Sequence, residues 1–526
     1  MTGVQTCALP IFADEFSVIA PDTPGFGLSD YRKGTPSDIT IYAEMVKEFV
    51  DALGLSELCI YGFHTGAIIG AEMARLYPDL CKAVVVNGLW VADKDEVDLI
   101  LQHYTEWFEP TPNGSQMPWI WSRLRDQLIF FPWFLKEEKY RLSHDLPSPE
   151  LKQPFVLDLL RTTEEAQTAY RAAFLYPSKE RVQEINTPTF LLNYQGDPIG
   201  DHPQRLEITP DCVQIELLSD PQAVEARARE IFREFSLAKI TIQPEAVVMP
   251  EKAVRLKGFV HTSFGPLFYC QEADQSNVSE ETNRSVVFLH DFAASSNATI
   301  EIAKYCESVH RKIFIDLPGH GETGPTHLDD YQPQTMAKML AEGLMQLNLG
   351  PVHLVSMGMS SSIAVALSLI DSLEIKQLSL IDPWCPNASE MNAIRDHYAP
   401  DLTPSEYGEH LMRGWYFARD SELYFPWYDT KNANALKREP EIEPQKTHAR
   451  AVDALKAGTE LKRVAKDMIG YDVEANLRDI SVNTKVYAWT GNGRENYAER
   501  IHRAISGSKL YYLPENRSQW SINLAE

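Results

Sequence analysis

Short apolar runs alternate with amphipathic stretches along the chain, and this alternation predicts an open sheet covered by helices. The apolar runs at residues 57–61 and 83–86 are typical of buried strands. Apolar residues recur at helical spacing in residues 41–53 and 67–75. We predict a further strand at residues 17–20, directly before a proline–glycine turn. Strands that alternate with helices in this way favour an α/β domain with a mostly parallel sheet.

The same order of elements returns 294 residues later. The turn at residues 22–27 (DTPGFG) recurs at 316–321 (DLPGHG), and residues 62–66 (GFHTG) fall on 356–360 (SMGMS). The strands and helices expected in the second copy are residues 312–315, 334–347, 352–355, 363–370 and 378–381. One spacing held over so long a stretch indicates that a single unit has been duplicated in tandem.

Each copy contains a long insertion in which the sheet pattern stops and aromatic-rich helical sequence takes over. The insertions cover about residues 91–184 and 385–479, and strand-like segments follow at 189–193 and 485–489. An insertion of ~90 residues is too long for a loop without structure of its own. We predict a helical cap over the carboxyl edge of each sheet, where open α/β folds bind ligands.

The 294-residue spacing also pairs aromatic, charged and histidine residues of the two caps. They are His103, Trp121, Arg125, Asp126 and Trp133 in the first copy, and His397, Trp415, Arg419, Asp420 and Trp427 in the second. The aromatic members are typical of cap packing. Charged side chains are costly to bury unless paired, so Arg125 and Asp126 either pair at the cap edge or point with His103 into a pocket. An aromatic pocket with few polar groups suits a small, largely apolar molecule.

The chain divides into two domains joined near residues 238–252, where periodicity stops and prolines appear. Its 526 residues exceed what one core usually supports, and we predict domains at 12–237 and 253–526. Residues 1–11 (MTGVQTCALPI) resemble the translation of a sequencing-library adapter, so they are excluded from the predicted fold.

The second copy has strand-like material before its proline–glycine turn that the first copy lacks. These segments are residues 253–260, 267–271 and 285–290. The repeat spacing therefore predicts that roughly 50 native residues are absent from the front of the first domain.

Composition narrows the classes of partner. A formal net charge of −25 opposes binding to nucleic acid or to an anionic membrane. No apolar run reaches the ~18–20 residues of a membrane helix, and no signal peptide is recognisable. Seven cysteines without a CxxC pair indicate neither a zinc site nor a disulfide framework. These features predict a cytoplasmic protein without a metal or other cofactor.

Residues 17–30 (SVIAPDTPGFGLSD) and 60–67 (IYGFHTGA) resemble a strand-and-turn and a nucleophile elbow of the α/β-hydrolase superfamily, near its capped epoxide-hydrolase and haloalkane-dehalogenase-like branch. The resemblance extends over nearly the whole chain after Ile11. It implies two tandem α/β-hydrolase domains, each with a helical cap insertion, the first truncated at its N-terminus. The candidate substrate contacts beside the two elbows are Phe63, Thr65, Met357 and Met359.

The residue at the centre of this elbow is the nucleophile in the family, but His64 stands there in the first domain and Gly358 in the second. Imidazole can attack a carbon or accept a proton, so His64 is a candidate catalytic group. The alternative is a neutral, hydrogen-bonded histidine in a pocket that has lost its catalytic function, where it is either a relic or a contact to a ligand. In the second domain, a shifted frame would offer Ser360 as nucleophile, although the shift breaks the 294-residue spacing.

The rest of the catalytic triad is incomplete. The family places an acid after the strand that follows the cap, and Asp197 matches it in the first domain. The second domain has no match at this site unless Glu495 or Asp382 substitutes. Neither residues 216–222 nor 512–517, where the base is expected, contain histidine. A Ser-His-Asp relay is therefore intact in neither domain.

The oxyanion-hole turn of the family is recognisable only in the second domain. His290 matches it and Asp291 departs from it. The N–H of Phe292 remains a possible donor, whereas a carboxylate beside it would oppose a developing anion.

Three classes of function follow. The first is an atypical hydrolase or lyase for small apolar esters, epoxides or related carbonyl compounds, centred on His64 and Asp197. The second is a catalytically inactive pair that binds a small molecule. The third is an assembly role, with the second domain as a scaffold for the first or for a homodimer. The fold alone does not choose among them.

Overall fold

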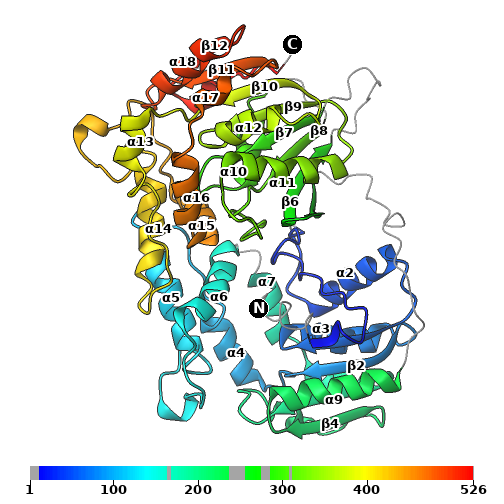
Figure 1. Ribbon diagram of the computed structural model, residues 1–526. Coiled ribbons are helices and arrows are strands. Elements are labelled where there is room, and N and C mark those ends of the chain that lie inside the picture. The colour runs from blue at the N-terminus through cyan, green and yellow to red at the C-terminus, as the bar shows by residue number, and fades with distance from the viewer. Residues whose placement is uncertain are drawn as a thin grey trace. The chain divides into compact units, whose positions relative to one another are not determined.

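The computed structural model describes residues 11–32, 34–162, 167–235, 255–273, 285–306 and 311–524 (Figure 1). The chain separates into two compact units, the first formed by residues 1–109 and 119–250 and the second by residues 110–118 and 251–526. Most of the adapter-like segment and the expected linker at 238–252 lie outside the described residues.

The sheet of the first unit has four strands in the order in which they occur in the chain, and every neighbouring pair is parallel. They are β1 (Leu58–Phe63), β2 (Cys81–Asn87), β3 (Thr189–Tyr194) and β4 (Val213–Leu218). The helices that alternate with them are α2 (Ile39–Ala52), α3 (Thr65–Leu76) and α9 (Pro221–Glu234). The strand–helix alternation expected from the apolar pattern is therefore present.

The strand expected at residues 17–20 is not formed, and this prediction was wrong. Its counterpart in the second unit, β8 (Arg311–Ile315), pairs with a strand on each side. The described residues of the first unit contain no counterpart of those two partners. An apolar run without a neighbouring strand has no ladder partners, so residues 17–20 form no strand.

The second unit contains an eight-stranded sheet in the order β12-β11-β10-β9-β7-β8-β6-β5. Its other strands are β5 (Leu256–Thr262), β6 (Gly265–Ala273), β7 (Ser285–Leu289), β9 (Val352–Met357), β10 (Ile375–Ile381), β11 (Asn483–Trp489) and β12 (Lys509–Leu513). The pairs β5–β6 and β6–β8 are antiparallel, and the remaining pairs are parallel. The sheet is mostly parallel, as predicted.

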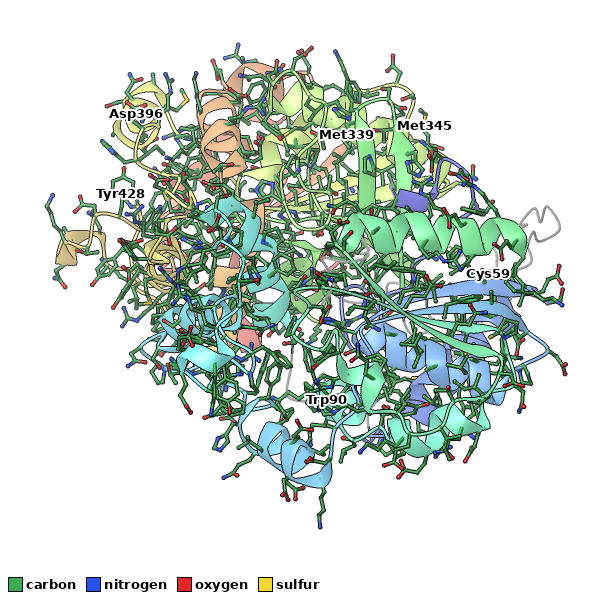
Figure 2. The ribbon with its side chains drawn as sticks, turned by 90° about the horizontal axis from the view of Figure 1, so that it is seen from below. Cys59, Trp90, Met339, Met345, Asp396 and Tyr428 are labelled. Carbon is green, nitrogen blue, oxygen red and sulfur yellow. The ribbon has the colours of Figure 1, made fainter. Side chains whose placement is uncertain are left out.

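Helices pack against this sheet through one apolar face. The helices nearest the strands are α10 (Ser296–Ala303), α11 (Pro333–Gln346), α12 (Ser360–Ser368) and α18 (Glu495–Ala504). Within α11, Met339 is fully buried in the core whereas Met345 is 47% exposed (Figure 2). Such a contrast within one helix is expected where only one stripe of the surface faces the sheet.

A helical insertion lies between β2 and β3 in the first unit and between β10 and β11 in the second. In the first unit it holds α4 (Lys94–His103), α5 (Gln116–Gln127), α6 (Pro149–Arg161), α7 (Gln167–Phe174) and α8 (Ser178–Arg181). In the second unit it holds α13 (Ala388–Ile394), α14 (Glu409–Asp420), α15 (Pro444–Ala457), α16 (Glu460–Ile469) and α17 (Glu474–Leu477). Within the described residues, no helix is both long enough and apolar enough to cross a membrane.

Several elements of the second unit begin and end 294 residues after the corresponding elements of the first unit. Helix α11 repeats the bounds of α2, and β9 and β10 repeat those of β1 and β2. The isolated backbone pair between Phe130 and Arg141 returns between Tyr424 and Ala435. This correspondence is what the duplication that we infer requires.

Candidate functional site

The site of the first unit is centred on the turn between β1 and α3. His64 stands alone between the last residue of β1 and the first residue of α3, with a φ of 48°. This left-handed conformation is uncommon for a residue with a side chain. A Cβ added to Gly62 would overlap the backbone of Gly66, so the turn requires glycine at position 62. The geometry is that of the sharp elbow predicted from the sequence.

Asp197 lies against His64. It follows β3, and its Oδ2 is 3.1 Å from Nε2 of His64. The carboxylate is almost completely buried, whereas the imidazole is 33% exposed. The N–H of Ile199 donates to Oδ1 of Asp197 at 2.8 Å, and the ring of Phe63 stacks on the imidazole at 3.9 Å. The carboxylate of Asp197 at one edge of the imidazole and the ring of Phe63 on one face together restrain the orientation of the His64 side chain.

The electrostatics of this pair keep Asp197 charged. Burial acts to raise the pKa of Asp197, but the hydrogen bond and charge of His64 and the N–H of Ile199 outweigh it, so the pKa falls below its ordinary value. An ionised carboxylate accepts a hydrogen bond from Nε2–H of His64. In the neutral imidazole Nδ1 then carries the free lone pair, the arrangement of an oriented general base.

His202 is a second histidine in this region, and sequence reasoning did not single it out. Its Nδ1 accepts the N–H of Val91 at 3.2 Å, and its ring lies 4.9 Å from that of Trp90. Burial, followed by the charge of Arg205, lowers the pKa of His202 to about 4. It is therefore neutral near pH 7 and holds the segment after β2 in place.

The corresponding turn of the second unit is filled by a carboxylate. Gly358 follows β9 with a φ of 59°, so it occupies the elbow position. Oδ1 of Asp291 accepts the N–H of Met359 and the N–H of Phe292, both at 2.7 Å. These are the two donors that would form an oxyanion hole in this family. Asp291 thus occupies both N–H groups at which the sequence resemblance predicts an oxyanion hole.

His290 supports that turn without taking part in proton transfer. Its Nδ1–H donates to the carbonyl of Asp291 at 2.7 Å, and its Nε2 accepts the N–H of Leu317 at 2.9 Å. Complete burial lowers its pKa to about 4. Both nitrogens of a neutral imidazole are thereby used in backbone contacts.

Ser360, the alternative nucleophile, lies in the first turn of α12 and is fully buried. Its Oγ accepts the N–H of Met357 at 3.1 Å and lies within hydrogen-bond distance of the carbonyls of Leu289 and Met357. The hydroxyl satisfies backbone groups at the beginning of the helix.

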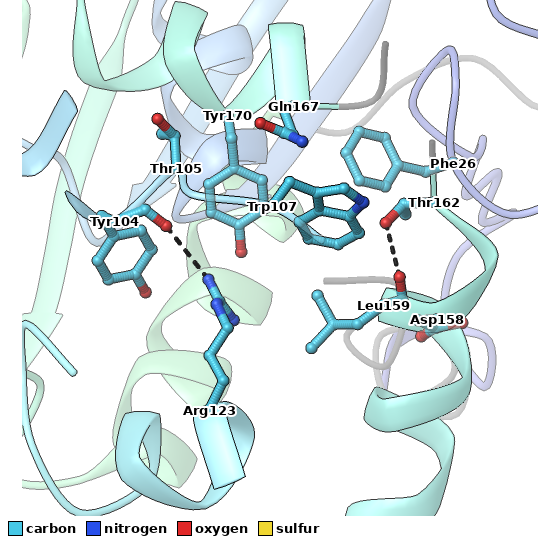
Figure 3. A pocket seen from close by; sticks show the side chains of 10 residues that line it. All are labelled: Phe26, Tyr104, Thr105, Trp107, Arg123, Asp158, Leu159, Thr162, Gln167 and Tyr170. Atoms are coloured by element: carbon cyan, nitrogen blue, oxygen red, sulfur yellow. Dashed lines mark hydrogen bonds between the residues drawn. The ribbon is translucent and has the colours of Figure 1, made fainter. Parts of the chain in front are cut away.

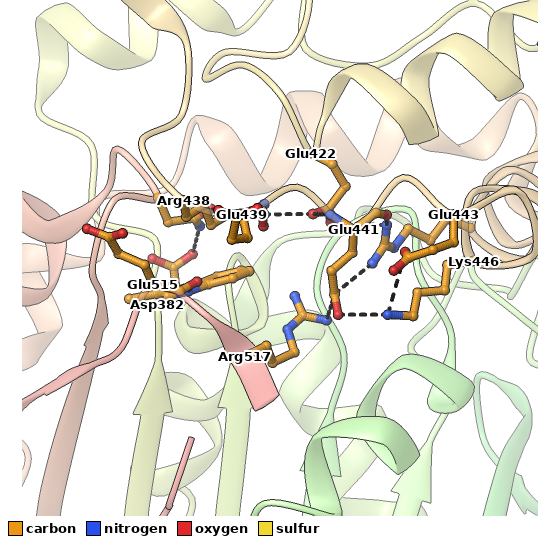
Figure 4. Close-up of polar contacts among 12 residues, drawn as sticks. Asp382, Glu422, Arg438, Glu439, Glu441, Glu443, Lys446, Glu515 and Arg517 are labelled. Atoms are coloured by element: carbon orange, nitrogen blue, oxygen red, sulfur yellow. Dashed lines mark hydrogen bonds and ion pairs between the residues drawn. The ribbon is translucent and has the colours of Figure 1, made fainter. Parts of the chain in front are cut away.

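A chain of buried charges stands where the second unit would hold the rest of a triad (Figure 4). Asp382 accepts hydrogen bonds from Arg494 and, at 2.5 Å, from Asn492. Arg494 also lies 3.6 Å from Asp291. Arg438 donates to Asn492 at 2.6 Å and so links this group to the helical insertion.

This series of buried ion pairs continues through the helical insertion to Arg517, which follows the last strand of the sheet. Arg438 donates to Glu422 at 2.7 Å, and Arg450 lies 3.2 Å from Glu422. Burial acts to raise the pKa of Glu422, but the charges of these arginines dominate and lower it to about 2. Arg517, in the stretch where the family base is expected, pairs with Glu441 at 2.7 Å. Ion pairs thus occupy the stretches in which the sequence resemblance predicts the catalytic acid and base.

In the part of the chain that the structure describes, Asp126 and His103 make local contacts within the helical insertion. Asp126 pairs with Lys136 at 2.5 Å, and the ring of His103 lies 5.1 Å from that of Phe134. Trp121 is buried, as cap packing requires. Among the described residues His64 forms no hydrogen bond or ion pair with His103, Arg125 or Asp126.

In the second unit the matching residues form local contacts. Arg419 and Asp420 pair at 3.2 Å, and Trp427 donates its indole N–H to the carbonyl of Tyr398 at 2.7 Å. Trp415 is buried, and the ring of His397 lies 5.8 Å from that of Tyr428.

Sequence reasoning missed a pocket in the helical insertion of the first unit (Figure 3). Its lining includes Tyr104, Trp107, Arg123, Gln167 and Tyr170. A signal for it exists in the sequence, because Arg123 and Gln167 fall on Phe417 and Leu461 at the 294-residue spacing.

Comparison with known proteins identifies the class. A family model described as the alpha/beta hydrolase fold matches residues 2–208 and 284–405, more than half of the chain. The protein belongs to the α/β-hydrolase superfamily.

Curated relatives match shorter stretches. Haloalkane dehalogenase 2 of Mycobacterium tuberculosis is 36% identical over 77 residues, which cover 15% of this chain and 27% of the relative. The monoacylglycerol lipase ABHD6 of Rattus norvegicus is 27% identical over 101 residues, covering 19% of this chain and 30% of the relative. The chain thus spans roughly a third or less of the length of these relatives.

Among solved structures, an esterase from Exiguobacterium antarcticum is 20% identical, with a TM-score of 0.37 over 49% of this chain and 90% of the esterase.

Proposed function

We propose that the first unit hydrolyses a small, largely apolar ester, epoxide or related carbonyl compound, with His64 as general base and Asp197 as its positioning residue. The observation that carries the proposal is the 3.1 Å contact between the buried carboxylate of Asp197 and His64, which occupies the turn between β1 and α3 with a φ of 48°. Relatives named as a dehalogenase and a lipase support a hydrolytic reaction class.

For an ester, the chemistry runs through an activated water. Nδ1 of His64 takes a proton from water while the water oxygen forms a bond to the carbonyl carbon. The negative charge moves to the carbonyl oxygen, for which the N–H of Thr65 at the start of α3 is a donor. The tetrahedral intermediate then expels the alkoxide, which takes the proton from His64. The products are the acid and the alcohol.

The experiment is a hydrolysis assay of the full chain against short nitrophenyl esters and styrene oxide, beside His64→Ala. Turnover should fall by on the order of 10²–10⁴, the usual contribution of a general base. His144→Ala, which removes an exposed histidine of the same unit, is the matched control and should leave turnover unchanged. Turnover that persists in His64→Ala but is lost in Ser360→Ala would move the reaction to the second unit and contradict the proposal.

For the second unit we propose a non-catalytic role, as a scaffold or a binding module. The supporting observation is Asp291, whose carboxylate accepts both N–H donors of the oxyanion hole. A bound carboxylate repels the anion that an acyl-transfer intermediate would place there. Equal turnover in the wild type and in Asp291→Asn would agree with this role, whereas loss of turnover in that variant would contradict it.

A further inference from the structure

Strand β1 forms one edge of the sheet in the first unit. Among the described residues it pairs with β2 alone, whereas its counterpart β9 is an interior strand that pairs with β10 on one side and with β7 on the other. The opposite edge strand, β4, is not in this position, because β12 at the matching end of the second sheet is an edge strand too. The second unit therefore shows what covers the equivalent edge of a complete sheet.

Backbone groups of β1 point to this free edge. The N–H groups of Leu58 and His64 donate to carbonyls on the β2 side. Because backbone groups alternate between the two sides of a strand, those of Cys59 and Tyr61 point away from β2. Outside the β1–β2 ladder, neither residue forms a backbone hydrogen bond within the described ranges. Such a row of unpaired groups is a template for a further strand.

The side chains of β1 are those of a strand that is paired on both sides. Its sequence, LCIYGF, contains no charge and no proline, as is typical of a buried parallel strand. The first four residues of β1 are nevertheless partly exposed, whereas the corresponding four of β9 are all buried. The other edge strands of the two sheets each carry a charged side chain, which hinders further pairing. These side chains are Glu216 in β4, Lys257 in β5 and Lys509 in β12.

We propose that the free edge of β1 is a docking site for one further segment of this protein, an extended apolar strand equivalent to β7. The occupant is the counterpart of β7 within the roughly 50 native residues that the repeat spacing predicts for the front of the first domain. It adds to β1 in the parallel direction, as β7 pairs with β9. The inference is independent of the proposed hydrolysis, because strand pairing uses neither His64 nor Asp197.

The second unit also gives the register of this pairing. Val286 of β7 lies opposite His353 of β9, and His353 corresponds to Cys59 at the 294-residue spacing (Figure 2). The residue of the occupant that is equivalent to Val286 therefore lies opposite Cys59. The backbone groups of Cys59 and Tyr61 then gain hydrogen-bond partners, and the partly exposed side chains of β1 gain a neighbour on their open side.

Fluorescence anisotropy of a labelled peptide, with the sequence of residues 285–290 (SVVFLH) and two added lysines for solubility, measures docking on the full chain. The second unit already contains its own β7, so the peptide probes β1. It should bind with saturation, and at least tenfold more tightly than a peptide of the same residues in scrambled order.

Two N-methylated forms of the peptide separate strand pairing from apolar contact. One is methylated at the residues equivalent to Val286 and Phe288, and the other at those equivalent to Val287 and Leu289. Because alternate N–H groups face a neighbouring strand, one form should lose at least tenfold in affinity and the other should bind as the unmodified peptide does.

Proline substitutions test the location. Cys59→Pro removes an N–H that points to the free edge and leaves the β1–β2 ladder paired, as proline does on an edge strand. This variant should bind the peptide at least tenfold more weakly. Ile215→Pro is the matched control, because Ile215 lies in the edge strand β4 and its N–H points away from β3 by the same alternation. It should bind the peptide as the wild type does. If the melting temperature of Cys59→Pro shows that it does not fold, the N-methylated peptides test the same contact.

The inference is overturned if the peptide fails to bind up to roughly 1 mM, if the scrambled peptide or both methylated forms bind equally well, or if folded Cys59→Pro binds it normally. Residues 1–10 lie outside the described residues. Binding only after their deletion would assign the edge to these residues. Sedimentation of the full chain with and without peptide tests a second copy as the occupant, since the peptide would then dissociate a dimer. Either of these two results would also overturn the inference.

Discussion

The carboxylate of Asp291 lies in the space into which a side chain at position 358 would project, and Gly358 is the residue that leaves this space open to it. A Cβ added to Gly358 would overlap the carboxyl group of Asp291. At the equivalent elbow position of the first unit, His64 keeps its side chain with a φ of 48°. The backbone of the elbow therefore tolerates a side chain, and it is Asp291 that excludes one from the second unit.

The first prediction follows from this exclusion. Gly358→Ser restores the residue type of a hydrolase elbow, but we expect no gain in ester hydrolysis. The second unit should lose about 1–3 kcal/mol of stability, the usual cost of forcing atoms into a filled space. Urea unfolding and the ester assay measure the two effects.

A double-mutant cycle isolates the cause. Asp291→Ala removes the overlapping carboxylate, so the double variant with Gly358→Ser should be more stable than the sum of the single effects by about 0.5–3 kcal/mol. Strict additivity would show that the strain at position 358 comes from the backbone and not from Asp291.

The second prediction concerns Asp197. In Asp197→Asn, hydrolysis should fall on the order of 10²–10⁴-fold, because an amide N–H beside Nε2 favours the wrong tautomer of His64. Burial acts to raise the folded-state pKa of Asp197, but the hydrogen bond and charge of His64 and the N–H of Ile199 hold it below its ordinary value. The associated stability is thus present at neutral pH and is lost as the pH falls through that lowered pKa.

Unfolding measured from pH 7 down to pH 3 checks this sign. The difference in stability between the wild type and Asp197→Asn should shrink as the solution becomes acidic. A difference that stays constant or grows would show that the carboxylate of Asp197 contributes no charge interaction.

The fold was predictable from the sequence because the periodicity of apolar residues within each segment is a local signal for strand or helix. The runs at 83–86 and 378–381 became β2 and β10, and the segment 334–347 became α11 with its ends shifted by one residue. The segment 17–20 failed for a reason outside itself, since a strand exists only where another strand pairs with it.

The site was predictable only in part. The elbow and the acid position are sequence motifs, so His64 and Asp197 were found, and the structure places them 3.1 Å apart. Asp291 was recognised as an obstacle to an oxyanion, but its occupation of both donors depends on a backbone geometry that a sequence does not show. Arg123 escaped notice because an arginine in a helix is usually solvated. Its counterpart Phe417 was the available signal.

The third prediction concerns the buried ion pair of the second unit. Arg438→Met removes the partner that donates to Glu422 at 2.7 Å. We expect a loss of roughly 3 kcal/mol, the low end for breaking a buried pair, because Arg450 remains beside the carboxylate. Adding Glu422→Gln should recover part of the loss, since no unpaired charge is then buried. Urea unfolding of the wild type, Arg438→Met and the double variant measures this, and a further loss in the double variant would contradict it.

The last prediction concerns Asp453, which lies in α15 and accepts a hydrogen bond from Ser295 at 2.9 Å. Burial raises its pKa to about 7, although the charge of Lys456 opposes this. In the unfolded chain an aspartate titrates near 4, so between about pH 4 and pH 7 only the unfolded state gives up this proton. The wild type should therefore lose about 1.4 kcal/mol of stability per pH unit over that interval, relative to a variant with a neutral side chain. Asp453→Asn keeps an acceptor for Ser295 and removes the titration, so its advantage over the wild type should grow from pH 5 to pH 8. Urea unfolding of both proteins at the two pH values measures this advantage, and an advantage independent of pH would show that Asp453 is already ionised in the folded protein at pH 5.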